Sequence, residues 1–408
     1  MNAMRSFVVI AALATLSCGG GSGPADPGAG MPATMTQLAP ATQTAVVANS
    51  TPVAPEVVVT DGAGQPVADV QVTFTVVGGE GHVTRSTMAT TLSGRASTDW
   101  YLGPRAGDGH RLRATAGGLV VEFAATATPL VSGAQYLGAK AYVEMIPGDL
   151  PVIISAPHGG LLEPTTMPDR TGSSITTVRD FNTQVLAHDI AAALRARTGK
   201  SPTLVIMRLD RKKIDANREI IEAAQGNPEA ERAWHQFHGF IEAARAILVD
   251  RQQPGFYIDL HGHAHPIARI EWGYRLTTAD LGQTDAMLNS SAMVQKSSVG
   301  ALAAHSGAPH AEIVRGPNSL GALLEARGFP SVPSLAQPDP GDNPYFSGGY
   351  NTSRHASRDG NLISGVQLEA YRIGIRDTDA NRAQFSASLA EALDLYFATW
   401  YNTSLSAN

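Results

Sequence analysis

The sequence predicts a multi-domain protein in which an all-β sandwich precedes an α/β domain. Residues 36–130 hold short segments in which apolar and polar residues alternate, which is typical of half-buried strands. Longer helical periodicities that alternate with apolar strands appear only beyond residue 135, and this pattern favours α/β layers. The length of 408 residues also exceeds that of one small domain.

The overall composition excludes several classes of partner and site. The net charge is -6, from 30 Lys and Arg against 36 Asp and Glu, so the chain lacks the positive charge that binding to nucleic acid requires. A single cysteine excludes a disulfide framework and any multi-cysteine metal site. A bound metal would therefore need histidine and carboxylate ligands, and the chain has 12 histidines.

The N-terminus has the pattern of an export signal. Arg5 precedes an apolar run over residues 7–16, and Cys18 follows this run. The segment resembles a bacterial lipoprotein signal over residues 1–18 with Cys18 as the lipidated residue, and residues 19–35 form a flexible tether. A plain secretory signal is the alternative. No segment reaches the ~20 apolar residues of a membrane-spanning helix, so we expect an exported protein of the cell envelope, lipid-anchored at the outer membrane or cell surface, or secreted. The membrane is then contacted only through the lipid anchor.

Residues 36–130 predict an immunoglobulin-like sandwich. About seven short strands in this range, separated by glycine-rich turns, are typical of that fold. The run 64–74 (GQPVADVQVTF), together with 94–96 (GRA) and 100–103 (WYLG), resembles bacterial Ig-like domains of the invasin and intimin type. Since no titratable cluster lies here, we interpret the domain as a spacer; a ligand-binding module is the alternative that stays open.

The α/β domain is expected over residues 135–405. Helices are predicted over residues 180–198, which Gly199 ends, and after Pro228, with Trp234, Phe237, Ile241 and Leu248 on its buried face. Apolar strands are predicted over residues 150–156, 203–208, 256–260 and 365–370. Functional sites of open α/β sheets form at the carboxyl ends of strands, and polar residues follow three of these strands.

Two of these strand ends predict a metal site. The first delivers His158 into a Gly-Gly turn, and Glu163 follows five positions later. The second runs into histidines at alternate positions, His261, His263 and His265. Asp259 lies on the same face as His261 and could fix the tautomer of its imidazole. The residues alone leave open which of the three histidines binds, and whether one or two metals are held; we expect one ion.

Two other segments fit a hydrolytic role. Asn217 and Arg218 follow a strand that ends in Arg208, and guanidinium groups there suit bidentate capture of a substrate carboxylate. Surface ion pairing is the alternative. Glu369 lies on an apolar strand, where an acid is unfavourable unless it is paired or functional. It is a candidate general base.

The segments 155–160 (SAPHGG), 215–218 (DANR), 259–263 (DLHGH) and 365–369 (GVQLE), in this order, resemble the N-formylglutamate amidohydrolase family. Members of this family are similar in fold to zinc carboxypeptidases, so the resemblance implies an α/β/α, zinc exopeptidase-like domain. It also implies that His158, His261 and Glu163 bind zinc, that Glu369 is the general base, and that Asn217 and Arg218 hold the substrate carboxylate. The spacing of five between His158 and Glu163 resembles phage poly-γ-glutamate hydrolases instead of carboxypeptidases.

We therefore expect an exported zinc-dependent amidohydrolase that cleaves an amide bond near a carboxylate. The expected substrate is an N-acyl amino acid, a γ-glutamyl compound or a peptide C-terminus. We expect no nucleic acid as a partner. The alternative from another functional class is a non-catalytic cell-surface adhesin whose hydrolase domain has decayed. The sequence indicates neither the natural amide nor the oligomeric state.

Overall fold

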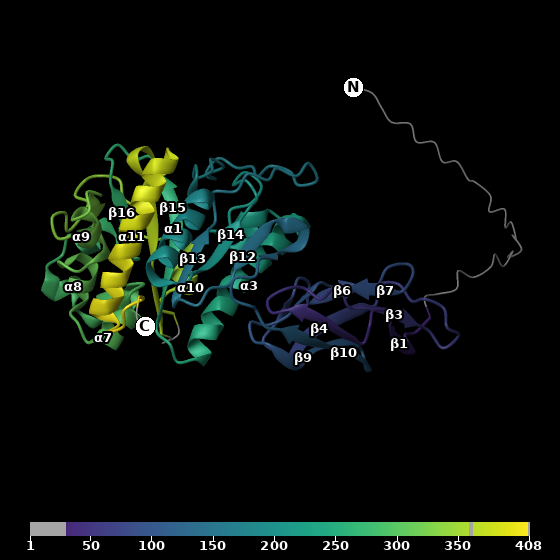
Figure 1. Cartoon of the computed structure of the whole chain (residues 1–408). Coiled ribbons are helices and arrows are strands. Elements are labelled where there is room, and N and C mark those ends of the chain that lie inside the picture. Colours follow the sequence, from purple (N-terminus) through teal and green to yellow (C-terminus); the bar gives the residue numbers. More distant parts are fainter. Residues whose placement is uncertain (1–29, 359–361, 407–408) are drawn as a thin grey trace, which may run out of the picture.

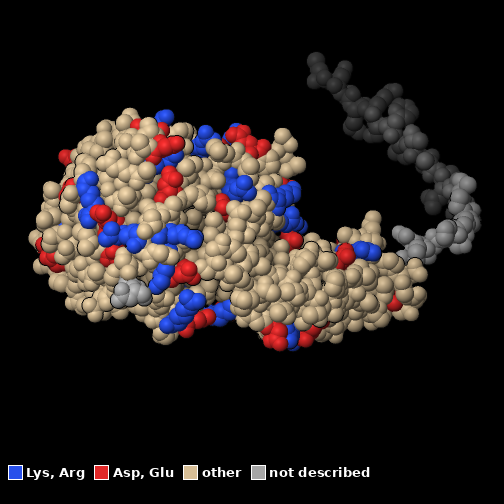
Figure 2. Space-filling view, in the orientation of Figure 1, with Lys and Arg blue, Asp and Glu red and all other residues tan. Residues whose placement is uncertain are grey.

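A computed structural model describes residues 30–358 and 362–406 of the chain. The expected export signal with Cys18, and most of the expected tether, lie outside these residues. None of the helices in the described ranges combines the length and the apolar character that crossing a membrane would require. On the face shown in Figure 2, Lys and Arg side chains are interspersed with Asp and Glu.

The N-terminal part is all β and is built from two larger sheets and a small one. The sheets have the strand orders β1-β3-β7, β2-β10-β9-β4-β6 and β5-β8. Inward residues such as Val59, Phe74, Leu112 and Phe123 are buried at alternate positions of their strands, which explains the period of two in the sequence. The strands are β1 (Thr34–Gln37), β2 (Thr42–Val46), β3 (Glu56–Thr60), β4 (Gln71–Gly78), β5 (His82–Val83), β6 (Thr87–Ala89), β7 (Arg95–Ser97), β8 (Trp100–Tyr101), β9 (Gly107–Ala116) and β10 (Leu119–Thr128).

The rest of the chain is mixed α/β, which agrees with the predicted fold class. It is organised around an eight-stranded sheet of order β11-β12-β14-β13-β15-β18-β16-β17. The four strands at its centre, β14, β13, β15 and β18, are parallel to one another. Both faces of these strands are buried, and β13 and β14 are accordingly almost continuously apolar. The strands are β11 (Tyr136–Leu137), β12 (Val143–Ile146), β13 (Val152–Ala156), β14 (Thr203–Met207), β15 (Gly255–His263), β16 (Ile270–Gly273), β17 (Ser331–Val332) and β18 (Ile363–Tyr371).

Helices cover both faces of this sheet (Figure 1). On one face α1 and α11 share an apolar cluster with Val152 and Ile154, and on the other α3 shares a cluster with Ile153. The helical elements are η1 (Ala139–Ala141), α1 (Thr183–Thr198), α2 (Ile220–Ala224), α3 (Pro228–Asp250), α4 (Thr278–Leu281), α5 (Asp285–Leu288), α6 (Ser291–Lys296), α7 (Gly300–Ser306), α8 (His310–Arg315), α9 (Leu320–Glu325), α10 (Tyr350–His355), η2 (Arg372–Arg376) and α11 (Asp379–Trp400).

The structure moves several of the predicted boundaries: β13 begins at Val152, β15 extends to His263, and β18 begins at Ile363. The first strand, β1, begins at Thr34, inside the range expected as tether. Helix α1 begins at Thr183 instead of at residue 180, so Asp180 lies outside the helix and its carboxylate is available elsewhere. The predicted helix stop is confirmed, since Gly199 adopts a left-handed conformation at the end of α1.

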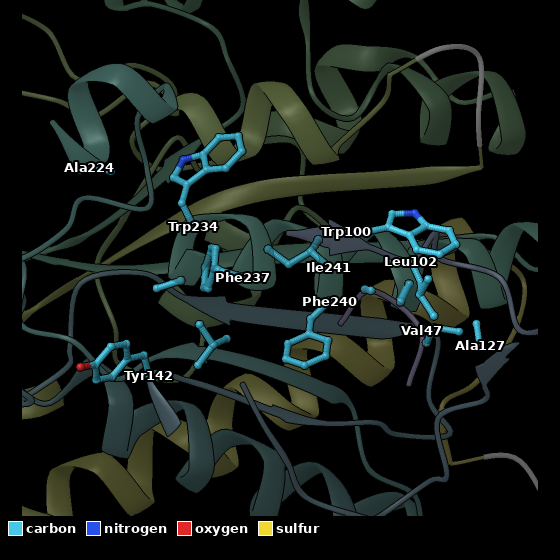
Figure 3. Packing of buried hydrophobic residues seen from close by; sticks show 14 of the residues in the cluster. Val47, Trp100, Leu102, Ala127, Tyr142, Ala224, Trp234, Phe237, Phe240 and Ile241 are labelled. Atoms are coloured by element: carbon cyan, nitrogen blue, oxygen red, sulfur yellow. The ribbon is translucent and has the colours of Figure 1, made fainter. Parts of the chain in front are cut away.

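The β-rich part packs directly against α3. Figure 3 shows Val47 and Leu102 of the β-rich part beside Phe240 and Ile241 of the helix, and all four belong to one continuous apolar cluster. Polar contacts surround this cluster: Arg105 pairs with Asp250 at 2.9 Å, Arg232 with Asp99 at 2.8 Å, and Gln236 Nε2 donates to Asn49 Oδ1 at 3.0 Å. The β-rich part therefore shares its core with the α/β part, which a flexible spacer would not do.

Close approach of the two parts depends on Gly239. A Cβ atom at this position would lie 3.2 Å from the Cβ of Ala48. We predict that Gly239→Leu separates the β-rich part from α3 and lowers the Tm by a few degrees, because overpacking costs about 1–3 kcal/mol. The intrinsic helix propensity changes in the opposite direction, by about 1 kcal/mol in favour of leucine. Calorimetry showing an unchanged or higher Tm would contradict this role of Gly239.

Candidate metal centre

The carboxyl ends of the central parallel strands bring three predicted site residues together. His158 lies two residues beyond the end of β13, and His261 lies in β15. Strand register places Glu369 of β18 directly beside His261. This meeting of separate segments follows from the parallel arrangement, because strands that run in one direction end at the same edge of the sheet.

Two histidine nitrogens and one carboxylate oxygen face one another at this edge. His158 Nδ1 lies 3.4 Å, and His261 Nδ1 3.3 Å, from Asp180 Oδ2. All three side chains are buried, and their ligand atoms lie within 4.8 Å of one another. His158 Nδ1 has no hydrogen-bond partner in the part of the chain that the structure describes. Two imidazoles and a carboxylate in this arrangement have the donor types that Zn²⁺ takes in proteins.

Each of the two imidazoles is held from behind by a second buried carboxylate. His158 Nε2 lies 2.6 Å from Asp215 Oδ1, and His261 Nε2 lies 2.8 Å from Asp259 Oδ2. The carboxylates accept the Nε2 protons, so in the neutral form of each imidazole Nδ1 is the nitrogen with the lone pair, and it faces the shared space. Such pairs orient histidine ligands and raise their basicity in metal sites.

The holding carboxylates are themselves fixed by neutral donors and by an arginine. Asp259 accepts hydrogen bonds from Ser155 Oγ at 2.6 Å and from Asn351 Nδ2 at 3.2 Å. Asp215 Oδ2 accepts two hydrogen bonds of 3.1 Å from Arg211. Both histidine orientations are therefore determined by residues of β13, α10 and the loop after β14.

Electrostatics keep the carboxylates of this centre ionised. Burial alone would raise the pKa of Asp180, but the two histidines outweigh burial and hold this pKa well below its ordinary value. The pKa values of Asp215 and Asp259 are lowered in the same way against burial, mainly by His158 and His261 respectively. In return, the carboxylates overcome burial and raise the pKa of His261. The space between the Nδ1 atoms therefore favours positive charge, whether it is a proton or a metal cation.

Glu369 presents a free carboxylate oxygen beside this centre. Its Oε1 accepts a hydrogen bond of 2.8 Å from Gln367 Nε2, while Oε2 has no partner among the residues described. Burial raises the pKa of Glu369 to about 8, and the charge of Asp180 adds to this effect although His261 opposes it. Because positive charge stabilises a carboxylate, a cation bound nearby would lower this pKa and favour the ionised form.

The centre opens into a cavity of about 650 Å³. His158, His261 and Glu369 line it, as does Asn217. The Asn217 side chain is also engaged within the protein, because its Oδ1 accepts from Asn351 N at 2.8 Å and its Nδ2 lies 3.4 Å from His261 Nε2. The amide oxygen thus fixes the start of α10, and the residue also borders the cavity.

Of the predicted substrate-binding arginines, the structure places only Arg218 in this cavity. Arg218 also pairs with Glu222 at 3.1 Å. Arg208 is directed elsewhere, with its Nη1 donating to Ala141 O at 2.8 Å. Arg179 and Arg372 line the cavity as well, and neither was singled out in the sequence.

Glu163 does not join the metal centre. Its side chain is 47% exposed and pairs with Lys212 Nζ at 2.7 Å. Asp180 takes the place beside the two histidines that was expected for Glu163. Two hydrogen bonds hold it there: its backbone N–H donates to His158 O at 3.0 Å, and its Oδ2 accepts from Gly262 N at 3.1 Å. The only sequence signal for Asp180 was a carboxylate at the start of a predicted helix, which ordinarily indicates a helix terminus.

His263 and His265 form a second cluster with Glu271. Both ring nitrogens of His263 have protein partners: Nε2 donates to Arg269 O at 2.8 Å, and Nδ1 accepts from His265 N at 3.2 Å. His265 Nδ1 lies 2.9 Å from Glu271 Oε1. A metal here would have to displace these hydrogen bonds, whereas the Nδ1 atoms of the first cluster already face one another.

Comparisons with known proteins place this chain in no family. No protein-family model matches it, and no curated protein does. A solved structure of gene product Atu2144 from Agrobacterium tumefaciens is 13% identical, with 63% of this chain and 95% of that chain covered and a TM-score of 0.39. The D00-D0 domain of intimin is 18% identical, with 23% of this chain and 45% of that chain covered and a TM-score of 0.20.

The carboxylate ligand can be identified by metal content. We predict that Asp180→Ala loses most bound zinc, because it removes the oxygen between the two Nδ1 atoms, while the control Glu163→Ala keeps it. Likewise, His261→Ala should lose zinc and His263→Ala should retain it. Elemental analysis of dialysed proteins measures this, and a zinc-free Glu163→Ala or a zinc-loaded Asp180→Ala would refute the assignment.

The carboxylate behind His261 should affect metal affinity without touching the metal. We predict that Asp259→Asn weakens zinc binding by about 10–100-fold, as is usual for partners of metal-bound histidines. Glu271→Gln, which alters a buried carboxylate of the second cluster, is the matched control and should leave the affinity unchanged. Competition with a chromogenic chelator gives both values. Equal effects of the two substitutions would argue against metal at the first cluster.

Proposed function

We propose that this protein is a zinc-dependent amidohydrolase that cleaves an amide bond near a carboxylate group. One observation carries the proposal: two buried histidines direct their Nδ1 atoms at Asp180, and each is held through Nε2 by another buried carboxylate. This arrangement fits a zinc ion held by His158, His261 and Asp180. When bound, the metal would lower the pKa of water and polarise a substrate carbonyl.

Glu369 is the proposed general base. Glu369 lines the same cavity as His158 and His261, and its Oε2 has no partner among the described residues, so it could accept a proton from an attacking water and deliver it to the leaving nitrogen. Gln367 holds the other oxygen and thereby fixes the orientation of the carboxylate. Burial raises the pKa of Glu369 to about 8 when no cation is near, and a bound cation would lower this pKa toward the ionised form that a general base requires.

The arginines of the cavity support a carboxylate-bearing substrate. Arg218, Arg179 and Arg372 line the cavity, and guanidinium groups bind carboxylates through paired hydrogen bonds. Arg372 is exposed and stacks over the ring of Phe181 at 4.8 Å, which keeps its donor groups near the cavity mouth. An N-acyl amino acid, a γ-glutamyl compound or a peptide C-terminus would present both the amide and the carboxylate.

We also infer the finer assignments from the sequence resemblance. Residues 135–405 would form an α/β/α domain of the zinc exopeptidase type related to N-formylglutamate amidohydrolases. Residues 36–130 would form an Ig-like domain, in keeping with their two packed sheets. Lipidation at Cys18 would place the enzyme at the cell envelope, so an extracellular amide is the proposed substrate.

The decisive variant for the mechanism is Glu369→Gln. Glutamine keeps the shape but cannot accept the proton of water, so we predict a turnover about 10²–10⁴-fold lower with zinc content unchanged. The assay would use N-acyl amino acids, γ-glutamyl peptides and peptides with a free C-terminus, with and without a chelator. Glu163→Gln, which neutralises a half-exposed carboxylate, is the control and should keep full turnover.

Two other results would assign Glu369 a different role. Loss of zinc in Glu369→Gln would make it a ligand, and near-normal turnover with full zinc would make it a structural acid. Either result would overturn the base assignment. Absence of turnover in the zinc-loaded wild type on every amide class tested would overturn the proposed activity and favour the non-catalytic adhesin.

A further inference from the structure

A second cavity, of about 510 Å³, lies where the β-rich part meets α3 and α10. The β-rich part contributes His82, Val83 and Leu102 to its lining, and the α/β part contributes Trp234 and Arg354. This cavity shares no lining residue with the one at the candidate metal centre. The proposed hydrolysis therefore makes no use of it.

Arg354 supplies positive charge to this cavity without a carboxylate partner. No acidic side chain within the described ranges forms an ion pair with it, whereas the neighbouring Arg245 and Arg358 both pair with Glu242. Arg354 Nη1 donates to Tyr350 Oη at 2.8 Å, and its guanidinium lies 5.0 Å from the centroid of the Trp234 ring. Its Nε is buried and has no hydrogen-bond partner in the described part of the chain. Stacking on Trp234 fixes the guanidinium plane but leaves donor capacity unused.

The histidines of the cavity add hydrogen-bonding groups without adding charge. Burial lowers the pKa of His82 to about 4 and that of His235 to about 3, with Arg354 contributing to both shifts, so both imidazoles are neutral near pH 7. His82 stacks on Tyr101 with ring centroids 4.9 Å apart, and it lies 4.3 Å from His235. The result is a wall of flat rings, in which His82 Nε2 is buried and has no partner among the described residues.

We propose that this inter-domain cavity is a binding site for a small monocarboxylate with an aromatic or other apolar body. The carboxylate would bind Arg354, and the body would lie against the rings and the apolar side chains of Val83 and Leu102. A cation and apolar walls in one enclosed space suit a ligand that has both features.

The charge around the cavity favours a single negative charge on the ligand. Glu242 also lines the cavity. Burial would raise its pKa, but His355 and the nearby arginines outweigh burial and lower it to about 2, so Glu242 is ionised. Glu80 adds a second carboxylate to the lining. Glu80 pairs with Arg105 at 2.6 Å, and Glu242 pairs with Arg245 and Arg358, so Arg354 is the lining cation that one carboxylate on the ligand would balance.

Helix α10 connects the inter-domain cavity with the candidate metal centre. This six-residue helix carries Arg354 at the inter-domain cavity and Asn351 at Asp259, the carboxylate that holds His261. A carboxylate could therefore bind at Arg354 in the inter-domain cavity or at the arginines of the catalytic cavity. The experiment has to distinguish binding at these two cavities.

Fluorine NMR with 4-fluorobenzoate as the probe tests the proposal on the purified full-length protein. We expect saturable binding that Arg354→Gln weakens by about tenfold or more, since a hydrogen bond to a charged group is lost. Arg354→Lys, which keeps the charge, should weaken it less. Arg218→Gln in the catalytic cavity should leave the affinity within about twofold, because Arg218 does not line the inter-domain cavity and distant sites act independently.

Further variants keep the test decisive if Arg354→Gln fails to fold. Val83→Trp fills the cavity from the β-rich side without altering Arg354, and it should also abolish binding. The neutral isostere 4-fluorobenzamide should bind at least several-fold more weakly than the acid. Equal binding of acid and amide, loss of binding only in Arg218→Gln, or no binding to the wild type at millimolar probe would each overturn the proposal. None of these results depends on whether the protein hydrolyses amides.

Discussion

The candidate site depends on two buried pairs in which a carboxylate holds a histidine. Asp215 holds His158 and Asp259 holds His261, so that both Nδ1 atoms are directed at Asp180. The pairs join segments from four places in the chain: the turn after β13, the loop after β14, strand β15 and the segment before α1. Without such pairs an imidazole at a strand end rotates freely or turns to solvent, and no shared ligand space would form.

The surrounding fold can be understood as the support that these pairs require. Buried ionised groups are tolerated only where every charge is paired or hydrogen-bonded. Strand β13 provides Ser155 to Asp259, α10 provides Asn351 to the same carboxylate, and Arg211 neutralises Asp215. The long apolar strands keep these donors at fixed positions, and α3 in turn fixes the sheet through the cluster that it shares with the β-rich part. The β-rich part thus belongs to the same packing unit as the site.

Much of this architecture could be predicted from local patterns, because strands and helices have a sequence period. The four central strands, α1 and α3 were predicted in this way, and so were the strand ends that carry His158, His261 and Glu369. Asp180 and the holding role of Asp215 were not predicted, since they lie in irregular segments whose course is set by backbone contacts such as Asp180 N–H to His158 O. Glu163 was preferred because it is near His158 in sequence, but the chain turns it outward to Lys212. The contact between Gly239 and Ala48 likewise has no local signal, because it joins residues that are distant in the chain.

The balance of charge at the candidate centre supports the proposed divalent cation. Asp180, Asp215, Asp259 and Glu369 are gathered around two imidazoles, and Arg211 offsets part of their charge. The carboxylates raise the pKa of His261, so the space between the imidazoles favours positive charge, whereas the pKa of Glu369 is raised mainly by burial. A proton on one Nδ1 satisfies only that ring. A cation held by His158, His261 and Asp180 would interact with all three side chains at once, and its charge would also favour the ionised form of Glu369 that a general base requires. The same electrostatics that hold the ligands together therefore prepare the base.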